Sequence, residues 1–201
     1  MHVKICGITT EDAAHQALAS GADFIGFIFA ESKRKINPEE AARISGPLPS
    51  TIKKVGVFVN ETKENMLAIA EQVGLDVIQL HGEEPAELAE QLPYEVIKAF
   101  PVKMESIHTI SAYPCDYYLL DSPIGAYRGG NGTTFDWDLV TETKLNPNKI
   151  ILAGGLSPDN VQQAIATAKP TGVDVSSGVE TDGKKDLSKI SQFIMQAKMK
   201  G

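Results

Sequence analysis

Short runs of β-branched and aromatic residues alternate along the chain with longer segments whose apolar positions recur at helical spacing. The short runs have the composition of strands, since they are rich in Val, Ile, Phe or Tyr and end in polar or glycine-bearing turns. They lie at Val3–Cys6, Phe24–Phe29, Lys54–Val59, Val77–His81, Glu95–Phe100, Tyr117–Asp121, Lys149–Ala153 and Val173–Ser176. The pattern predicts eight strands that alternate with seven or eight helices.

The intervening segments carry the apolar stripes and start signals of amphipathic helices. Three stripes are clear, at Met66, Ile69, Ala70 and Val73, at Val161, Ala164, Ile165 and Ala168, and at Leu187, Ile190, Ile194 and Ala197. Asn37-Pro38 supplies an N-cap and a proline at the first helical position, Ser157-Pro158 repeats both, and Thr9-x-x-Asp12 resembles a capping box. Lys103–Tyr113 has little periodicity, which predicts a weak fifth helix.

Strands that alternate with helices imply a parallel sheet, either an open doubly wound sheet or a closed (β/α)8 barrel. The chain has 201 residues, so each of eight units would hold about 25, near the lower limit for such barrels. No G-x-G-x-x-G motif follows the first strand, as a dinucleotide-binding open sheet would prefer. We therefore expect one α/β domain over residues 1–201, a compact (β/α)8 TIM barrel whose helix 5 is weak or replaced by a loop.

The composition narrows the class of protein further. The formal net charge is −7 and hydrophobic residues make up 42% of the chain, which excludes a disordered chain and disfavours binding to nucleic-acid phosphates. No apolar run approaches the ~18 residues of a membrane span, and the N-terminal apolar stretch is too short for a signal peptide. Two cysteines make no disulfide framework, so we expect a cytoplasmic protein that handles a small molecule.

Polar side chains stand where several of the predicted strands end. In a (β/α)8 barrel, catalytic residues lie at the C-terminal ends of the strands and in the loops that follow. The polar residues at these ends are Cys6, His81 and Asp121, and side-chain alternation gives them the inward-facing companions Lys4, Gln79, Asp174 and Ser176. Charged groups inside a barrel are costly unless they are paired, so their convergence at one rim marks a candidate site.

Each of these residues also has a structural explanation when it is taken alone. Cys6 could be a small buried hydrophobe, His81 a hydrogen-bonded histidine and Asp121 a loop-capping carboxylate. His81-Gly82-Glu83 lacks the spaced partners of a zinc site, so we expect no metal. Cys115 precedes the sixth strand and so lies at the opposite end of the barrel from Cys6, which makes a disulfide between them implausible and Cys115 structural.

Two glycine-bearing loops, after the seventh and eighth predicted strands, indicate an anion site. Gly154 and Gly155 open the first loop, and Ser177 and Gly178 belong to the second. Glycines let backbone N–H groups approach an anion, a helix N-terminus adds a favourable dipole, and these two loops of a barrel frequently hold a phosphate. The alternative is two ordinary turns.

Two further loops have a candidate role at the same rim. Arg34 lies in the basic segment 32–35, where its guanidinium fork would suit a carboxylate; a solvated loop is the alternative. Gly125–Gly132 is rich in glycine and has the character of a mobile lid over the site.

Seven motifs that occur in this order from Lys4 to Lys185 closely resemble the phosphoribosylanthranilate isomerase family of tryptophan biosynthesis. They are Lys4-Ile5-Cys6-Gly7-Ile8-Thr9, Ser32-Lys33-Arg34, Val57-Phe58-Val59-Asn60, Gln79-Leu80-His81-Gly82, Gly129-Gly130-Asn131-Gly132 with Phe135-Asp136-Trp137, Ala153-Gly154-Gly155-Leu156, and Asp174-Val175-Ser176-Ser177-Gly178-Val179-Glu180. Any one of them would be weak, whereas seven in order are specific.

The resemblance implies a cofactor-free Amadori rearrangement of N-(5-phosphoribosyl)anthranilate to 1-(2-carboxyphenylamino)-1-deoxyribulose 5-phosphate. Cys6 matches the family's general base and Asp121 its general acid, so we expect a lowered pKa for the thiol and a raised pKa for the carboxyl. Arg34 matches the residue for the anthranilate carboxylate, and His81 matches a site-lining position. The phosphate loops match at Gly154, Gly155, Ser177 and Gly178. Arg128 and Thr133 depart from the more usual pattern, which affects expectations for the lid rather than for the acid–base pair.

Other functions and one tuning hypothesis follow from the same residues. An aminoaldose isomerase of the histidine pathway would use paired Asp residues, and a non-catalytic binding barrel would need neither a thiol nor a protonated carboxyl.

Lys4 shares the inward face of Cys6, and the eighth strand adjoins the first in a closed barrel. We therefore hypothesise that Lys4 pairs with Asp174 and helps to ionise Cys6, the alternative being a purely structural ion pair. The partners expected are a phosphorylated small molecule, no nucleic acid and no membrane, with the chain a monomer or a homodimer.

Overall fold

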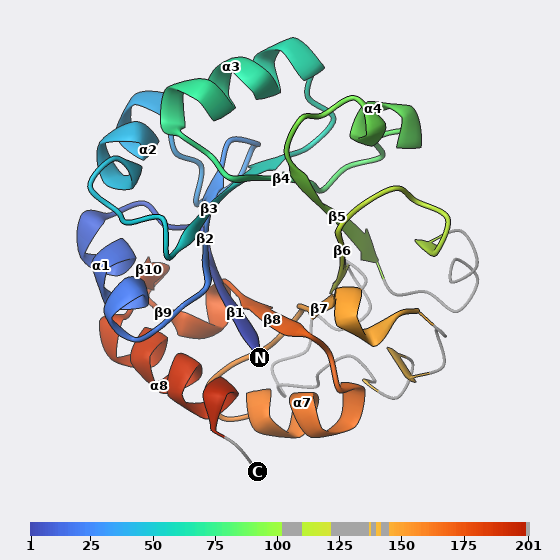
Figure 1. Cartoon of the computed structure of the whole chain (residues 1–201). Coiled ribbons are helices and arrows are strands. Elements are labelled where there is room, and N and C mark those ends of the chain that lie inside the picture. Colours follow the sequence, from blue (N-terminus) through green and yellow to red (C-terminus); the bar gives the residue numbers. More distant parts are fainter. Residues whose placement is uncertain (102–109, 122–136, 138–139, 142–144, 200–201) are drawn as a thin grey trace.

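Eight parallel strands form a closed barrel in the computed structural model, which describes residues 1–101, 110–121, 137, 140–141 and 145–199. Each strand is hydrogen-bonded to its sequence neighbours, and β8 returns to pair with β1 (Figure 1). The strands are β1 His2–Cys6, β2 Phe24–Ile28, β3 Lys53–Phe58, β4 Val77–Leu80, β5 Glu95–Pro101, β6 Tyr117–Asp121, β7 Ile150–Leu152 and β8 Gly172–Val175. The predicted barrel and all eight strands are confirmed, with ends that move by at most one residue.

Helices surround the barrel on its outer face (Figure 1). They are α1 Glu11–Ala19, α2 Pro38–Ser45, α3 Lys63–Val73, α4 Ala86–Glu90, α7 Val161–Ala168 and α8 Leu187–Lys198. The 3-10 turns η2 Pro147–Lys149 and η3 Ser177–Val179 and the hairpin of β9 Glu180–Thr181 with β10 Lys184–Lys185 complete the described elements. The weak fifth helix falls largely outside the described residues, and the proposed lid with Arg128 and Thr133 falls wholly outside them.

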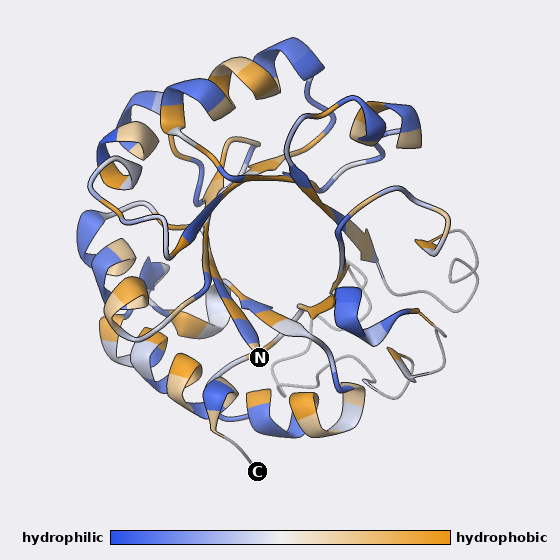
Figure 2. Cartoon of the chain, viewed as in Figure 1, coloured by the Kyte–Doolittle hydropathy of each residue, from blue (hydrophilic) through white to orange (hydrophobic). Residues whose placement is uncertain are grey.

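Two apolar clusters hold the fold together. The larger one lies between the strands and the helices, whose inward positions are hydrophobic and whose outward positions are hydrophilic (Figure 2). The smaller one fills the barrel with inward-facing side chains from six strands: Phe24, Val55, Val77, Ile97, Ala99, Leu119 and Ile151, with Ala153 just after β7. A barrel interior packed in this way is a solid support for a site at the rim, not a pore.

The predicted helix starts are correct at one place and displaced at two. Asn37 caps α2, because its Oδ1 accepts a hydrogen bond from the Glu40 N–H at 2.8 Å. Thr10, and not Thr9, caps α1. Ser157-Pro158 opens a turn instead of α7, because Asn160 Oδ1 accepts a hydrogen bond from the Ser157 N–H and the helix begins only at Val161.

Aromatic rings close the N-terminal end of the barrel. The Phe24 ring makes edge contacts with His2 and Tyr117, at centroid distances of 5.8 and 6.3 Å. The ammonium of Lys53, which is paired with Glu95, lies 5.8 Å from the centre of the Phe24 ring. These aromatic contacts stabilise the N-terminal end of the barrel. The polar groups described below lie at the C-terminal end.

Replacing Phe24 by alanine should therefore lower the free energy of unfolding by about 3–5 kcal/mol, because the buried ring leaves a cavity that its neighbours cannot fill. Urea denaturation measures this loss, with Met195→Ala on the exposed face of α8 as a control that should stay within about 0.5 kcal/mol of the parent. A loss of unfolding free energy in Phe24→Ala as small as that of the control would contradict the stabilising role of the aromatic rings at the N-terminal end of the barrel.

Candidate functional site

A buried thiol and a buried ion pair lie together at the C-terminal end of β1. Lys4 Nζ donates a hydrogen bond to Asp174 Oδ1 at 2.9 Å across the seam between β1 and β8, so the predicted pairing is confirmed. The Lys4 side chain is 1% exposed, and Cys6 is buried one pleat further along the same face. A Cβ built on Gly26 of the adjacent strand would lie 2.9 Å from Cys6 Sγ and 3.2 Å from Lys4 Nζ. The ammonium and the thiol therefore share the space that Gly26 leaves open.

The electrostatics of this group differ from the expectation. Burial raises the pKa of the Cys6 thiol, and the charge of Asp174 adds to the rise. The charge and hydrogen bond of Lys4 lower the same pKa, but the net direction is upward, which makes the predicted fall in the pKa wrong for the free protein. Burial also works against the charge on Lys4, yet Asp174 and Cys6 together hold its pKa above the ordinary lysine value. The resting site therefore pairs a protonated thiol with a permanently charged ammonium.

Asp121 and His81 form the second polar group of the rim. Asp121 ends β6, and its Oδ2 lies 3.7 Å from Nε2 of His81, which follows β4. The other ring nitrogen of His81, Nδ1, is 3.0 Å from the amide nitrogen of Gln79, an inward-facing residue buried in the barrel. Burial lowers the pKa of His81 although Asp121 opposes the shift, so the imidazole is neutral at pH 7. The structure thus brings together two predicted site residues that are far apart in sequence.

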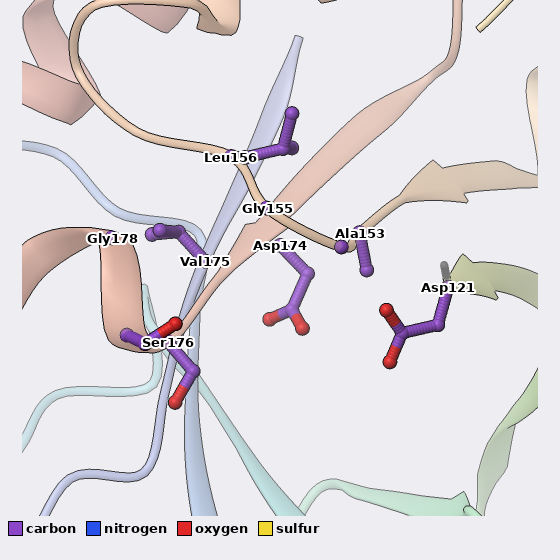
Figure 3. Close-up of a pocket in the computed structure, with 10 residues that line it drawn as sticks. Asp121, Ala153, Gly155, Leu156, Asp174, Val175, Ser176 and Gly178 are labelled. Carbon is purple, nitrogen blue, oxygen red and sulfur yellow. The ribbon is translucent and has the colours of Figure 1, made fainter. Parts of the chain in front are cut away.

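A cavity of about 190 Å³ opens beside these groups. The carboxylates of Asp121 and Asp174 both face this space (Figure 3). Its remaining wall is made by the two predicted glycine-bearing loops: Ala153, Gly154, Gly155, Leu156, Val175, Ser176, Ser177 and Gly178. The cavity therefore has acidic groups on one side and largely backbone on the other.

Glycine is required at several points of this backbone wall. Gly154 and Gly155 have φ values of +80° and +66°, a conformation that side chains disfavour. A Cβ on Gly178 would lie 1.8 Å from the carbonyl oxygen of Leu156, so the two loops touch through backbone alone. This close approach lets N–H groups of both loops face one small ligand, as an anion site needs.

Arg34 lies over the backbone beside Cys6 but is already engaged. Its Nε and Nη2 donate to the two carboxylate oxygens of Glu180 at 2.5 and 2.8 Å. Glu180 is the last residue of the motif that begins at Asp174, and the sequence alone did not predict a role for it. Arg34 also borders a second hollow of about 450 Å³, with Thr9, Lys33 and Lys184 among its lining residues.

A second buried ion pair supports His81, and the sequence reading missed it. Lys98 Nζ donates to Glu84 Oε2 at 2.9 Å and to the Gly82 carbonyl at 2.6 Å, while Glu84 accepts from the Gly82 N–H at 2.9 Å. These bonds fix the turn that directly follows His81. A lysine inside the apolar strand β5 was the available signal, because a buried ammonium requires a partner.

The two cysteines have the different positions that the sequence predicts. Both are free and buried, Cys6 at the C-terminal end of β1 and Cys115 before the start of β6. Burial raises the pKa of Cys115 to about 12, which leaves it an unreactive thiol. Within the described part of the chain, no helix is long and apolar enough to cross a membrane.

The closed barrel, with its acidic and thiol groups gathered at the C-terminal rim and two backbone-lined loops beside them, defines an enzyme of the (β/α)8 class. The family model for N-(5'-phosphoribosyl)anthranilate isomerase matches residues 3–196. The chain therefore belongs to the N-(5'-phosphoribosyl)anthranilate isomerase family.

Individual relatives agree with this assignment over nearly the whole chain. An N-(5'-phosphoribosyl)anthranilate isomerase from Listeria monocytogenes is 51% identical over 98% of each chain, and one from Oceanobacillus iheyensis is 49% identical over 100% of this chain and 98% of its own. The crystal structure of the Thermotoga maritima enzyme superposes with a TM-score of 0.88, at 44% identity and 98% coverage of both chains. A further structure of the family, with a TM-score of 0.85, 42% identity and 98% coverage of both chains, is a complex with reduced 1-(o-carboxyphenylamino)-1-deoxyribulose 5-phosphate.

Removing the Lys4–Asp174 pair should raise the apparent pKa of Cys6, because burial then acts without the ammonium, whose charge lowers this pKa more than the charge of Asp174 raises it. The variant is Lys4→Met combined with Asp174→Asn, so that no lone charge is left buried. The pH dependence of iodoacetamide labelling, read by peptide mass spectrometry, reports Cys6 separately from Cys115. The Cys6 profile should move to higher pH while that of Cys115 stays in place. An unchanged Cys6 profile would show that the ion pair is structural only.

Proposed function

We propose that Cys6 and Asp121 perform the acid–base chemistry by which this isomerase of tryptophan biosynthesis rearranges N-(5'-phosphoribosyl)anthranilate. The observation that supports this most directly is their placement: a thiol beside an ammonium at the end of β1 and a carboxyl at the end of β6, at the rim that also bears the backbone-lined cavity. A base and an acid at one substrate are what an aldose-to-ketose rearrangement requires.

In the first step, a protonated Asp121 gives its proton to the ribose ring oxygen. The bond between that oxygen and C1′ breaks, and the lone pair of the anthranilate nitrogen forms the C1′=N bond of a Schiff base. Cys6 as thiolate then removes the proton from C2′, and the electron pair of that C–H bond forms an enolamine. Loss of the proton from the 2′-hydroxyl and protonation of C1′ give the ketone.

The proton balance of these reaction steps shows which proton transfer must return Cys6 and Asp121 to their starting protonation states. Asp121 has lost one proton and Cys6 has gained one, so one proton must pass from the thiol side to the carboxylate before the next turnover. Lys4 is suited to favour the thiolate, because its charge lowers the pKa of Cys6. His81 lies beside Asp121 with a neutral ring, which lets it line the substrate without adding a charge.

The remaining groups bind the two anionic ends of the substrate. Gly154, Gly155, Ser177 and Gly178 hold the phosphate through backbone N–H groups, and Arg34 holds the anthranilate carboxylate. These groups require no cofactor and lie on one chain, so a monomer and a homodimer both suffice. A cytoplasmic location fits the two free thiols.

Removing either half of the acid–base pair should lower kcat by about 10²–10⁴-fold with a smaller effect on KM, because the anion-binding groups are untouched. The variants are Cys6→Ser and Asp121→Asn, and the assay is the loss of anthranilate fluorescence as substrate is converted. Cys115→Ser is the matched control and should retain the parent kcat. Activity within a few fold of the parent in both variants would refute the assignment of the pair, whatever the effect of the control.

A further inference from the structure

Four residues on the outer side of the rim form a hydrogen-bonded chain, of which the proposed function uses only Arg34. This Glu180 cluster consists of Arg34, Ser176, Glu180 and Lys185. Glu180 accepts from Arg34 on both carboxylate oxygens, and Lys185 Nζ donates to Glu180 Oε1 at 2.7 Å. Lys185 Nζ also donates to the Ser176 carbonyl at 2.8 Å. The side chains of Glu180 and Lys185 are only 8% and 4% exposed.

A tight turn between β9 and β10 brings two residues of this cluster together. Asp182 and Gly183 have φ values of +52° and +76°, the conformation of a two-residue hairpin turn whose twist matches the flanking strands. The turn pairs Lys185 directly with Glu180 across the β9–β10 hairpin. Because the hairpin directly follows the 3-10 turn Ser177–Val179, Glu180 is held next to the loop that lines the cavity.

The position of Arg34 is fixed by both packing and pairing. A Cβ on Gly7 would lie 2.6 Å from Arg34 Cδ, so the arginine stem runs directly over the residue that follows Cys6. Glu180 takes the edge of the guanidinium formed by Nε and Nη2, which uses two of its five N–H donors. The second edge, formed by Nη1 and Nη2, keeps donors for another planar, bidentate acceptor.

The charges of the cluster are suited to an anionic ligand. Burial works against the charge on Glu180, but the bonds from Arg34 and Lys185 bring its pKa below the ordinary value, so it is ionised at pH 7. Burial lowers the pKa of Lys185 and Glu180 opposes this shift, so the cluster has one carboxylate between two basic groups and a net positive charge when both are protonated. Without Glu180, Arg34 would have to order its long side chain each time a ligand binds, at a cost in conformational entropy.

We propose that Glu180 is a positioning residue that gives the enzyme its selectivity for a substrate with a ring carboxylate, by holding one edge of Arg34 so that the other edge meets that carboxylate. Through Lys185 it also joins Arg34 to the carbonyl of Ser176, the residue directly before the phosphate-loop residues Ser177 and Gly178, so the groups for the two anionic ends of the substrate are set at a fixed separation. This inference rests on the role of Arg34 in the proposed function.

The experiment compares two ligands by titration calorimetry: reduced 1-(2-carboxyphenylamino)-1-deoxyribulose 5-phosphate and its counterpart without the ring carboxylate. The parent protein should prefer the carboxylated ligand, and Glu180→Gln should reduce this preference by about tenfold, because the neutral amide no longer holds Arg34 by two charged bonds. The affinity for inorganic phosphate should stay within about twofold. Glu95→Gln, which breaks the Lys53–Glu95 pair at the opposite end of the barrel, is the control and should keep the full preference.

Arg34→Met separates this inference from the role assigned to Arg34 itself. Loss of the preference in Arg34→Met together with an unchanged preference in Glu180→Gln would overturn the positioning role alone. An unchanged preference in Arg34→Met would remove both. A uniform weakening of both ligands and of phosphate in Glu180→Gln would show that the cluster serves only to hold the loop, and would also overturn the proposal.

Discussion

The seam between β8 and β1 is the constraint on which the site depends. Closing the barrel places Asp174 opposite Lys4 in register, and only this closure gives a buried ammonium a partner at 2.9 Å. A buried charge without a partner is strongly destabilising, so the pair ties correct closure of the barrel to the assembly of the catalytic rim. Cys6, one pleat further along β1, then experiences the field of a cation that the fold itself requires.

The fold and the inner part of the site could be predicted from local patterns. Strand composition, helical stripes and the length of each unit were sufficient for the barrel, and strand alternation then placed Lys4 and Cys6 on one face. Neighbouring strands in a closed barrel gave Asp174 as the partner of Lys4. These predictions succeeded because each depends on geometry that repeats along the chain.

The outer part of the site could not be predicted in this way. Glu180 contacts Arg34 across 146 positions of sequence, through a loop and a hairpin whose paths no periodicity describes. The thiol pKa was predicted in the wrong direction, because the sequence shows the cation beside Cys6 but not the depth of its burial. The displaced start of α7 has a similar cause, since the side chain of Asn160 stabilises a turn where a proline favours a helix.

The raised pKa of Cys6 has a consequence for the lifetime of the enzyme. Oxidants and electrophiles react with thiolates, and a thiol that stays protonated at rest in a site of low solvent access reacts slowly with them. The same burial that makes this proposed base harder to ionise therefore protects it from irreversible oxidation between turnovers. A carboxylate base would need no such protection, so a sulfur base at this position requires that solvent has little access to it.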